Sequence, residues 1–277
     1  MKTLKKSIST VALPLLAAAM VCFGASGSAT VAEEAFSFAA IGDTAYSQRS
    51  EKEFENMLGS MNGEDLSFVV HVGDFEADPR PYGRSPDTIS KPCVDESFER
   101  VLASFQQSAH PFILTPGDND WTDCHLLKTD DVDPMERLDK LRQMFFPEGK
   151  SLGQNPMDVD SQAAMDGYGM YRENLAWSKN GVNFATIHIV GSNDNAGRSA
   201  ETEMEHQQRA EANIAWLKNA FAEAKASDAK GLVIVTQANV GFESHWSGRL
   251  QTRYVRSVAG TKAPEKVSET AFDKYIE

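Results

Sequence analysis

Short apolar runs that end close to a Gly-Asp pair recur three times in the first half of the chain. Apolar runs of this length, bounded by turn residues, are typical of buried strands. Glycine permits a tight turn, and the aspartate after it reaches the carboxyl edge of the sheet, where open α/β folds bind ligands. One such pair is usually only a turn, whereas three in succession favour a shared site. The runs are residues 36–41, 68–72 and 112–114, and the pairs are Gly42-Asp43, Gly73-Asp74 and Gly117-Asp118.

Apolar residues at helical spacing lie between and after these runs, and they predict three helices. The expected N-terminal residues are Ser50 with Glu53 in a capping box, Asp95, and Asp133 followed by Pro134. Strand and helix alternate as far as the third Gly-Asp pair. Alternation of this kind predicts parallel strands with crossover connections, and therefore an α/β fold.

Further extended runs predict more strands in the second half. Residues 171–178 and 182–190 are separated by an Asn-Gly turn, which is typical of hairpins. Residues 231–236, with the sequence GLVIVT, predict another buried strand. His71 and His188 lie within apolar runs, so we expect both to be hydrogen-bonded core residues.

A long acidic and alanine-rich helix is predicted at about residues 200–226. We expect Ile214, Leu217 and Phe221 to face inward, because they recur at helical spacing. The charged residues of this helix, and His206 among them, are expected on a solvated face.

The start of the chain predicts export. Lysines precede an apolar run at residues 11–23, and small residues follow it. This pattern is typical of a secretory signal peptide, which we place at residues 1–29, and the run is too short for an ordinary membrane span. We therefore expect a periplasmic or secreted protein without a stable membrane anchor, with one domain at residues 30–277. The last predicted helix, from Ser268, continues to Glu277, so we expect this domain to be truncated at its C-terminus.

Composition narrows the possible partners and the redox state. The chain of 277 residues has a formal net charge of −13 and lacks a basic stripe, which argues against nucleic acid as a partner. Beyond the signal peptide only Cys93 and Cys124 remain, and in an oxidising compartment two cysteines predict a disulfide. Closing such a loop contributes about 3 to 4 kcal/mol in the chain-entropy model. The alternative, zinc bound by Cys124 and His125, lacks a second close pair of ligands.

Polar residues at strand ends are the candidates for chemistry. Asp118, Asn119 and Asp120 follow the third apolar run with no gap except its Pro-Gly turn, and supply three oxygen ligands. Residues 191–195, GSNDN, end a further run, and either line the substrate side of a cleft, with Asn193 as a contact, or form only a loop. The sequence contains no Ser-His-Asp signature, no phosphate-binding P-loop and no dinucleotide fingerprint.

The run Gly-Asp-Asn-Asp-Trp-Thr-Asp-Cys-His at residues 117–125, with the two earlier Gly-Asp pairs, resembles the calcineurin-like metallophosphoesterases and their exported bacterial branch. The likeness extends over residues 36–239. It implies a four-layer α/β/β/α sandwich in which strand ends hold two metal ions. It also implies hydrolysis of small phosphate mono- or diesters by a water molecule that a divalent metal activates.

The resemblance assigns roles to particular residues of this chain. It implies metal ligation by Asp43, Asp74, Asp118 and Gln237, and catalytic roles for Asn119 and the retained Asp120. His125 is a possible replacement for the family's catalytic histidine, whose position Asn119 occupies. Asn239 shares with Gln237 the region of a further family histidine and is expected to contact substrate.

The departures from the family pattern change the expected chemistry. Ala45 stands where the first block of the family has a histidine, and the last histidine block is absent. Asn119 can donate a hydrogen bond but cannot act as an acid, so esters with poor leaving groups should be poor substrates. Because the remaining ligands are oxygens, magnesium, manganese or calcium is favoured over zinc, at one or two sites. The alternative function is a catalytically inactive metal- or phosphate-binding protein of the same fold.

Overall fold

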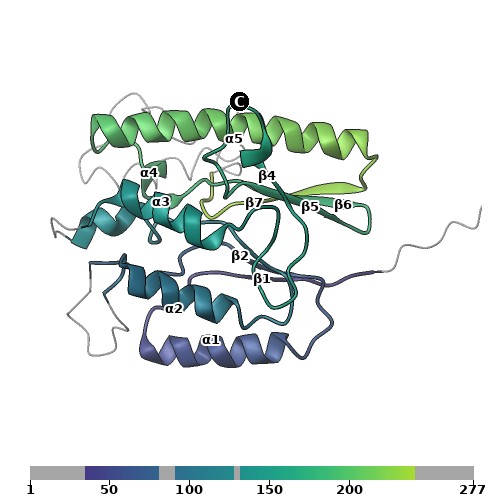
Figure 1. The fold of residues 1–277 in the computed structure, drawn as a ribbon, viewed down its shortest axis with the longest axis horizontal. Coiled ribbons are helices and arrows are strands. Elements are labelled where there is room, and N and C mark those ends of the chain that lie inside the picture. Colours follow the sequence, from purple (N-terminus) through teal and green to yellow (C-terminus); the bar gives the residue numbers. More distant parts are fainter. Residues whose placement is uncertain (1–34, 81–90, 128–131, 241–277) are drawn as a thin grey trace, which may run out of the picture. The chain divides into compact units, whose positions relative to one another are not determined.

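The computed structural model of this chain describes residues 35–80, 91–127 and 132–240 (Figure 1). This described part is a mixed α/β structure that contains two sheets, which confirms the general α/β prediction. The predicted signal peptide, residues 1–29, and the predicted C-terminal helix from Ser268 lie outside the described residues.

The first sheet has three parallel strands, β1 (Ala39–Ile41), β2 (Val69–His71) and β3 (Phe112–Leu114), in that order. Helix α1 (Gln48–Met61) connects β1 to β2, and α2 (Asp95–Phe105) lies between β2 and β3 in the sequence. The predicted parallel strands and intervening helices are thus confirmed, although each strand is short.

The register of this sheet brings distant segments together. Ile41 pairs with His71, and His71 pairs with Leu114, so the last residue of each strand lies in one row. Because the strands are parallel and end level, the segments that follow them leave from one edge of the sheet. The three Gly-Asp pairs therefore arrive at the same edge.

Two helix caps differ from the prediction. Helix α1 is capped by Ser47 rather than Ser50: the Ser47 hydroxyl accepts from the Ser50 N–H at 3.2 Å, and the Ser50 hydroxyl accepts from the Ser47 N–H at 2.7 Å. At α2 the N-cap is Val94, because Asp95 is already helical and its carboxylate forms an ion pair with Arg137 at 2.8 Å. In both helices a serine three residues into the motif completes the cap.

Helix α3 (Pro134–Phe145) follows a 3-10 helix, η1 (Thr122–Leu127), in the sequence. As predicted, Asp133 is its N-cap, and the Asp133 side chain accepts a hydrogen bond from the Met135 N–H at 2.9 Å. Proline at the first helical position suits this start, because its fixed φ is helical and it has no N–H to satisfy. The buried side of α3 packs against the main core.

The second sheet has the order β4-β5-β6-β7. Strands β5 and β6 form the predicted antiparallel hairpin, and the turn between them has φ values of 47° at Asn180 and 80° at Gly181, as two-residue hairpins require. Strand β7 pairs with β6 in parallel. The elements are β4 (Asp160–Ser161), the 3-10 helix η2 (Gln162–Ala164), β5 (Leu175–Lys179), β6 (Val182–Thr186) and β7 (Gly231–Val235).

The prediction that residues 231–236 form a buried strand is wrong about burial. Within the described part of the chain, Val233 and Ile234 of strand β7 are each 37% exposed. These neighbours point to opposite faces of the sheet, so both faces of β7 are partly open. The reason is its position, because β7 is the last strand of its sheet and pairs only with β6 among the described strands.

The two sheets contact each other through aromatic side chains. The Phe68 ring, beside β2, has its centroid 5.3 Å from that of Trp177 in β5 and 5.1 Å from that of Phe184 in β6. Val69 and Ile113 of the first sheet are fully buried in the same cluster. The main hydrophobic core therefore lies where the two sheets meet.

Helix α5 (Ala200–Ala226) contacts β6 and β7 and runs alongside the second sheet in Figure 1. Ile214 and Leu217 are partly buried against its core cluster, as expected. Two predictions for this helix are wrong: Phe221 is 59% exposed, and His206 is only 3% exposed. His206 is buried because a loop beside α5 supplies a partner for its ring, described below. None of the helices in the described part of the chain combines the length and apolar character needed to span a membrane.

Candidate functional site

Two of the three predicted aspartates meet directly at the edge of the first sheet. The Asp74 and Asp118 carboxylates share a hydrogen-bond donor, the Gln237 Nε2, which lies 3.2 Å from Asp74 Oδ2 and 3.2 Å from Asp118 Oδ1. The Gln237 Oε1 accepts a hydrogen bond from the Gly191 N–H at 2.7 Å. This bond fixes which end of the amide faces the carboxylates. The amide group thus lies between the two carboxylates.

The parallel pairing of β6 and β7 explains why Gln237 reaches this position. Val235 ends β7 opposite Thr186, and the Ala238 N–H donates to the Ile189 carbonyl at 3.0 Å, so the two chains remain side by side past the strand ends. Gln237 therefore lies opposite Gly191. The resemblance predicted a role for Gln237, and the sheet register places its side chain beside Asp74 and Asp118.

Glycines make room for the carboxylates. A Cβ atom at Gly117 would lie 2.0 Å from Asp74 Oδ1, and one at Gly191 would lie 2.4 Å from Asp118 Oδ2. Gly73 has a φ of +89°, and a Cβ there would lie 2.4 Å from the Gly117 backbone nitrogen. Contacts this short would force the loops apart, so glycine is needed for close backbone approach, as the sequence predicted.

Left-handed backbone conformations deliver the acids to the site. Asp43 has a φ of 55° and Asp74 a φ of 56°. Only glycine adopts this region freely, although aspartate tolerates it better than most residues. Strained residues of this kind cluster at functional sites, where surrounding contacts hold them.

The loop after β6 contains a left-handed turn, labelled α4 (Gly191–Asp194). Its backbone φ values are 49° at Ser192, 56° at Asn193, 51° at Asp194 and 68° at Asn195. The Ser192 hydroxyl donates to Asp118 Oδ2 at 2.9 Å, so the turn contributes a side chain to the site. The Asn193 side chain instead donates to the Ala196 carbonyl at 3.3 Å and stabilises the turn itself. The predicted substrate contact of Asn193 stays a prediction.

Asp43 approaches the same edge through Tyr46. The Tyr46 hydroxyl donates to Asp43 Oδ1 at 3.2 Å, and the Asp43 N–H donates to the Gly73 carbonyl at 3.2 Å. Burial raises the pKa of Tyr46, and the nearby carboxylates of Asp74, Asp43 and Asp120 raise it further. The phenol therefore keeps its proton and serves as a donor among acids.

Asp120 has a structural position rather than an open one. It is fully buried, and its carboxylate accepts three backbone hydrogen bonds, from Gly117 at 2.7 Å, Glu76 at 3.0 Å and Asp74 at 3.1 Å. These bonds tie the loop after β2 to the loop after β3. In this arrangement Asp120 holds the loops that carry Asp74 and Asp118, and its predicted catalytic role stays a prediction.

The acids of the site form no ion pairs with cationic side chains among the described residues. Burial, together with the carboxylates of Asp120 and Asp118, raises the pKa of Asp74 to about 9, and burial raises the pKa of Asp120 to about 7. Among the ion pairs within the described residues, none involves Asp43, Asp74, Asp118 or Asp120. The charged form of this cluster is therefore disfavoured in the protein alone.

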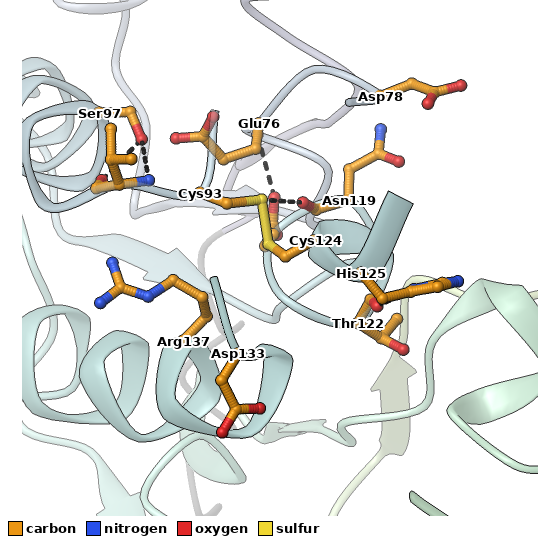
Figure 2. Close-up of a disulfide and its surroundings, with 12 residues drawn as sticks. Glu76, Asp78, Cys93, Ser97, Asn119, Thr122, Cys124, His125, Asp133 and Arg137 are labelled. Atoms are coloured by element: carbon orange, nitrogen blue, oxygen red, sulfur yellow. Dashed lines mark hydrogen bonds between the residues drawn. A yellow bond between two sulfur atoms is a disulfide. The ribbon is translucent and has the colours of Figure 1, made fainter. Parts of the chain in front are cut away.

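The disulfide between Cys93 and Cys124 is present, with a Cα–Cα distance of 5.8 Å (Figure 2). It confirms the predicted pairing and argues against these cysteines as zinc ligands. The Cys93 sulfur lies 4.0 Å from the Asn119 carbonyl oxygen, and the Asn119 N–H donates to Asp74 Oδ1 at 3.2 Å. The bridge thus supports the loop that carries Asn119.

His125 is close to Asn119 in sequence but not directed towards it. The side chain of His125 is exposed, and its Nδ1 lies 2.7 Å from the Thr122 carbonyl oxygen. Figure 2 shows the Asn119 and His125 side chains extending in different directions from their shared loop. The disulfide does not turn His125 inward, so its predicted catalytic role is without geometric support. Asn239 has an exposed side chain two residues beyond Gln237.

A second polar cluster lies fully buried behind the site and orders its loops. The Trp121 indole N–H donates to His188 Nε2 at 3.1 Å, so the imidazole proton is on Nδ1, which lies 2.9 Å from Glu173 Oε1. Arg142 forms an ion pair with Glu173 at 2.5 Å. His188 is thus a hydrogen-bonded core residue, as predicted, with a fixed tautomer.

Arg209 of α5 links this network to the left-handed turn. Its Nη1 lies 2.6 Å from Asp194 Oδ1 and donates to the His188 carbonyl at 2.9 Å. The guanidinium also lies over the Trp121 ring, with its central carbon 5.4 Å from the centroid. His206 Nδ1 lies 3.1 Å from Asp194 Oδ2, which is the partner that buries this histidine. Asp194 therefore fixes the turn to α5.

The observed donor set fits a cation only in part. In the part of the chain that the structure describes, no three histidine, cysteine, aspartate or glutamate side chains are grouped to hold a metal ion. Asp74 and Asp118 supply two converging carboxylates, and Gln237 supplies an amide whose oxygen faces away. Rotation of that amide would present its oxygen and complete a set of hard ligands, at the loss of the bond to Gly191.

Three residues of this site escaped the sequence analysis. Tyr46 follows the first Gly-Asp pair by three positions, and that offset alone carried no signal. Gly191 and Ser192 were within the GSNDN run, but the run could equally have been a loop. The partners of Gly191 and Ser192, which are Gln237 and Asp118, follow other strands, whereas the partner of Tyr46 is Asp43 in the same loop. Searches against protein-family models, curated proteins and solved structures found no match for this chain.

Proposed function

We propose that this chain is an exported metal-dependent phosphoesterase-like hydrolase, resembling the calcineurin-like metallophosphoesterases, that acts on small phosphate mono- or diesters. One observation carries the proposal: the Asp74 and Asp118 carboxylates converge on a single point without a cationic partner among the described residues. Two converging carboxylates repel each other and raise the free energy of the folded protein. A bound cation would offset that cost.

The proposed fold is the four-layer α/β/β/α sandwich. Ring contacts of Phe68 with Trp177 and Phe184 support the packing of the two sheets against each other. The contacts of α5 with β6 and β7 support one outer helical layer, and the packing of Phe54 of α1 into the main core supports the other. The site lies at the carboxyl edge of the first sheet, as such folds place ligands.

Asp74, Asp118 and Gln237 would hold a magnesium, manganese or calcium ion, with Asp43 nearby. Such an ion supplies positive charge for phosphoryl oxygens and lowers the pKa of a water molecule. The Asn119 backbone N–H holds Asp74 Oδ1 in place, and the Ser192 hydroxyl does the same for Asp118 Oδ2. The Asn119 side chain can donate a hydrogen bond to a phosphoryl oxygen but cannot protonate a leaving group. Esters of acidic alcohols are the substrates that this arrangement favours.

A second function, a binding protein without catalysis, is favoured by the Gln237 amide. Its Nε2 already donates to both carboxylates, which satisfies them without a metal ion. Ala45 and Asn119 also remove the histidines that the resembling enzymes use. The two functions differ in whether hydrolysis accompanies cation binding.

The test compares the wild-type protein with Asp74→Asn and with the control Asp158→Asn, whose side chain is 89% exposed outside the site. Manganese and magnesium binding is measured by calorimetry, and hydrolysis is measured with 4-nitrophenyl phosphate and bis(4-nitrophenyl) phosphate. Asp74→Asn should weaken cation binding by at least about 10-fold and remove hydrolysis, because a direct carboxylate ligand is lost. The control should leave both unchanged.

Each outcome separates the alternatives. Cation binding that depends on Asp74 but brings no hydrolysis with any of the metals would establish the binding protein. Absence of both cation binding and hydrolysis in the wild-type protein would contradict the hydrolase and the metal-binding protein, and only a phosphate-binding protein would be left.

A further inference from the structure

A cavity of about 130 Å³ lies between helix α1, helix α2 and the loop after β1. The two helices cover the same side of the first sheet (Figure 1), and an ion pair between Glu51 of α1 and Arg100 of α2, at 2.8 Å, joins them. Protein interiors are normally packed as densely as organic crystals, so a gap of this size between neighbouring helices is an exception. The cavity is therefore a candidate for a bound small molecule.

The walls of the cavity combine two aromatic rings with small side chains. The Phe54 ring of α1 and the Phe105 ring of α2 both line it, and their centroids lie 6.0 Å apart with the planes tilted by 57°. Ala45, in the loop after β1, and Ser104 of α2 line it as well, and neither side chain is large enough to fill the space. Because aromatic pairs prefer tilted and offset contacts, a further ring would pack well against these two.

The Ser104 hydroxyl is the polar group of the cavity whose hydrogen bonding selects the ligand. It donates to the Arg100 carbonyl, four residues earlier in α2, at 3.1 Å. This bond uses the only proton of the hydroxyl, whereas its oxygen can still accept a hydrogen bond. The cavity thus favours a ligand with a hydrogen-bond donor attached to its ring.

The charged side chains at the cavity already have partners of opposite charge. Arg100 pairs with Glu51, and Glu55 pairs with Lys52 at 2.7 Å. A charged ligand would lose its hydration and would have to compete with these ion pairs, so a neutral ligand is favoured. The side chains of Glu51 and Arg100 are each 33% exposed, so the cavity reaches the protein surface at this pair and a ligand can enter there.

We propose that this cavity is a binding site for a neutral one-ring aromatic molecule that carries a hydroxyl group, of the phenol class. The volume is sufficient, because an engineered apolar cavity of about 150 Å³ in another protein binds benzene. The ring would pack against Phe54 and Phe105, and its hydroxyl would donate to Ser104 Oγ. This inference is independent of the proposed function, since Asp74 and Asp118 are not among the residues that line the cavity.

The experiment measures binding of phenol, benzene and benzoate to the full chain by nuclear magnetic resonance titration. The wild-type protein should bind phenol with a dissociation constant of about 1 mM, as burial of one ring predicts, and should bind benzoate more weakly. Ser104→Phe places a ring inside the cavity and should weaken phenol binding by at least about 10-fold. The matched control, Ala103→Phe, adds the same ring at the exposed neighbouring position and should leave phenol binding unchanged.

A second variant tests the hydrogen bond. Ser104→Ala should weaken phenol binding by about 3- to 10-fold and leave benzene binding unchanged, because only phenol has a hydroxyl to donate. Equal effects on phenol and benzene would overturn the assigned role of Ser104. Benzoate binding as tight as phenol binding would overturn the preference for a neutral ligand.

The site itself is overturned if the wild-type protein shows no saturable phenol binding, or if Ser104→Phe binds phenol like the wild-type protein. Equal weakening by Ala103→Phe would place phenol on the outer surface of α2 and would also overturn it. Thermal unfolding checks that the variants are folded. Val101→Phe, which fills the same cavity from α2, repeats the test if Ser104→Phe does not fold.

Discussion

The protein buries carboxylates in two regions, and their pKa values are shifted in opposite directions. At the edge of the first sheet, Asp74 and Asp120 have no cationic partner among the described residues, and burial raises their pKa values. Behind the site, burial acts in the same direction on Glu173 and Asp194. There the charges of Arg142 and Arg209 prevail and hold the pKa values of these acids below their usual range.

The comparison separates acids whose charge is compensated by an ion pair within the described residues from acids whose charge is not. Arg142 forms an ion pair with Glu173, and Arg209 forms one with Asp194. The negative charges of that region are therefore compensated within the protein. The Asp74 and Asp118 carboxylates accept hydrogen bonds from neutral groups among the described residues, including the Gln237 amide that they share. We therefore propose a cation from solution as the partner of the acids at the edge of the first sheet.

Breaking the compensated region should have the largest effect. Arg142→Met leaves Glu173 buried and without its ion pair, and should lower the free energy of unfolding by about 3 to 5 kcal/mol. Denaturant unfolding measures this loss. The double variant Arg142→Met with Glu173→Gln removes both charges and should recover most of it. A single-variant loss below about 1 kcal/mol would mean that the pair is not desolvated as described.

The pH dependence of stability should have opposite signs in the two regions. The pKa values of Asp74 and Asp120 are raised to about 9 and about 7. Above the unfolded pKa near 4 the folded state binds the extra protons, so these groups stabilise the protein at low pH and that contribution is lost as pH rises towards 9. Glu173 and Asp194 behave oppositely, and their contribution is lost as pH falls below about 4.

Thermal or denaturant unfolding from pH 4 to pH 9, in a chelator, measures this dependence. Each excess proton should lower the free energy of unfolding by up to about 1.4 kcal/mol per pH unit. Magnesium or manganese should flatten the decline, since a bound cation favours the ionised acids. A decline of the same slope with and without the cation would contradict the division between the two regions.

Gln237→Glu should increase the difference between the two regions, because it adds a third acid beside Asp74 and Asp118, which have no ion pair among the described residues. The variant replaces the amide that lies between Asp74 and Asp118 with a carboxylate. Manganese affinity should rise by about tenfold, because cation sites strengthen with the number of charged ligands. The metal-free variant should be less stable than the wild-type protein at pH 8. Calorimetry and thermal unfolding measure the two effects, and unchanged affinity would place the cation elsewhere.

His125→Ala should have the smallest effect. The side chain is exposed and its Nδ1 contacts only the Thr122 carbonyl among the described residues, so the free energy of unfolding should change by less than about 0.5 kcal/mol. Hydrolysis of 4-nitrophenyl phosphate should also be unchanged. A large loss of hydrolysis at constant stability would restore the catalytic role that the sequence predicted for this residue.

Sequence reasoning succeeded where one local pattern decides the outcome. The parallel strands, the hairpin at Asn180, the cap at Asp133 and the disulfide follow from runs of a few residues. It failed where a neighbour from another element decides. Phe221 is exposed although it has helical spacing, since sheet position sets which face of α5 is covered.

The candidate site divides in the same way. The three Gly-Asp pairs indicated Asp43, Asp74 and Asp118 as candidates. The three strands are parallel and end level with one another, so they bring these residues to one edge of the sheet. Gly191 and Ser192 could not be assigned from the sequence, because their partners Gln237 and Asp118 are distant in the sequence. Tyr46 lies only three residues after its partner Asp43, but that spacing by itself gives no signal. The family resemblance predicted a catalytic role for Asp120, and its three backbone donors show that it also links the loops after β2 and β3.

The sequence by itself determined the alternation of strands and helices, the glycines that allow close approach, and the acids carried beyond the strands. These properties depend on periodicity and on the backbone preferences of single residues. The tertiary structure decided which buried acids are compensated. Glu173 meets Arg142 only because α3 packs against the segment before β5, and Asp74 meets Asp118 and Gln237 only through the strand registers. Charge compensation depends on distances of a few ångströms between elements, and sequence spacing does not contain those distances.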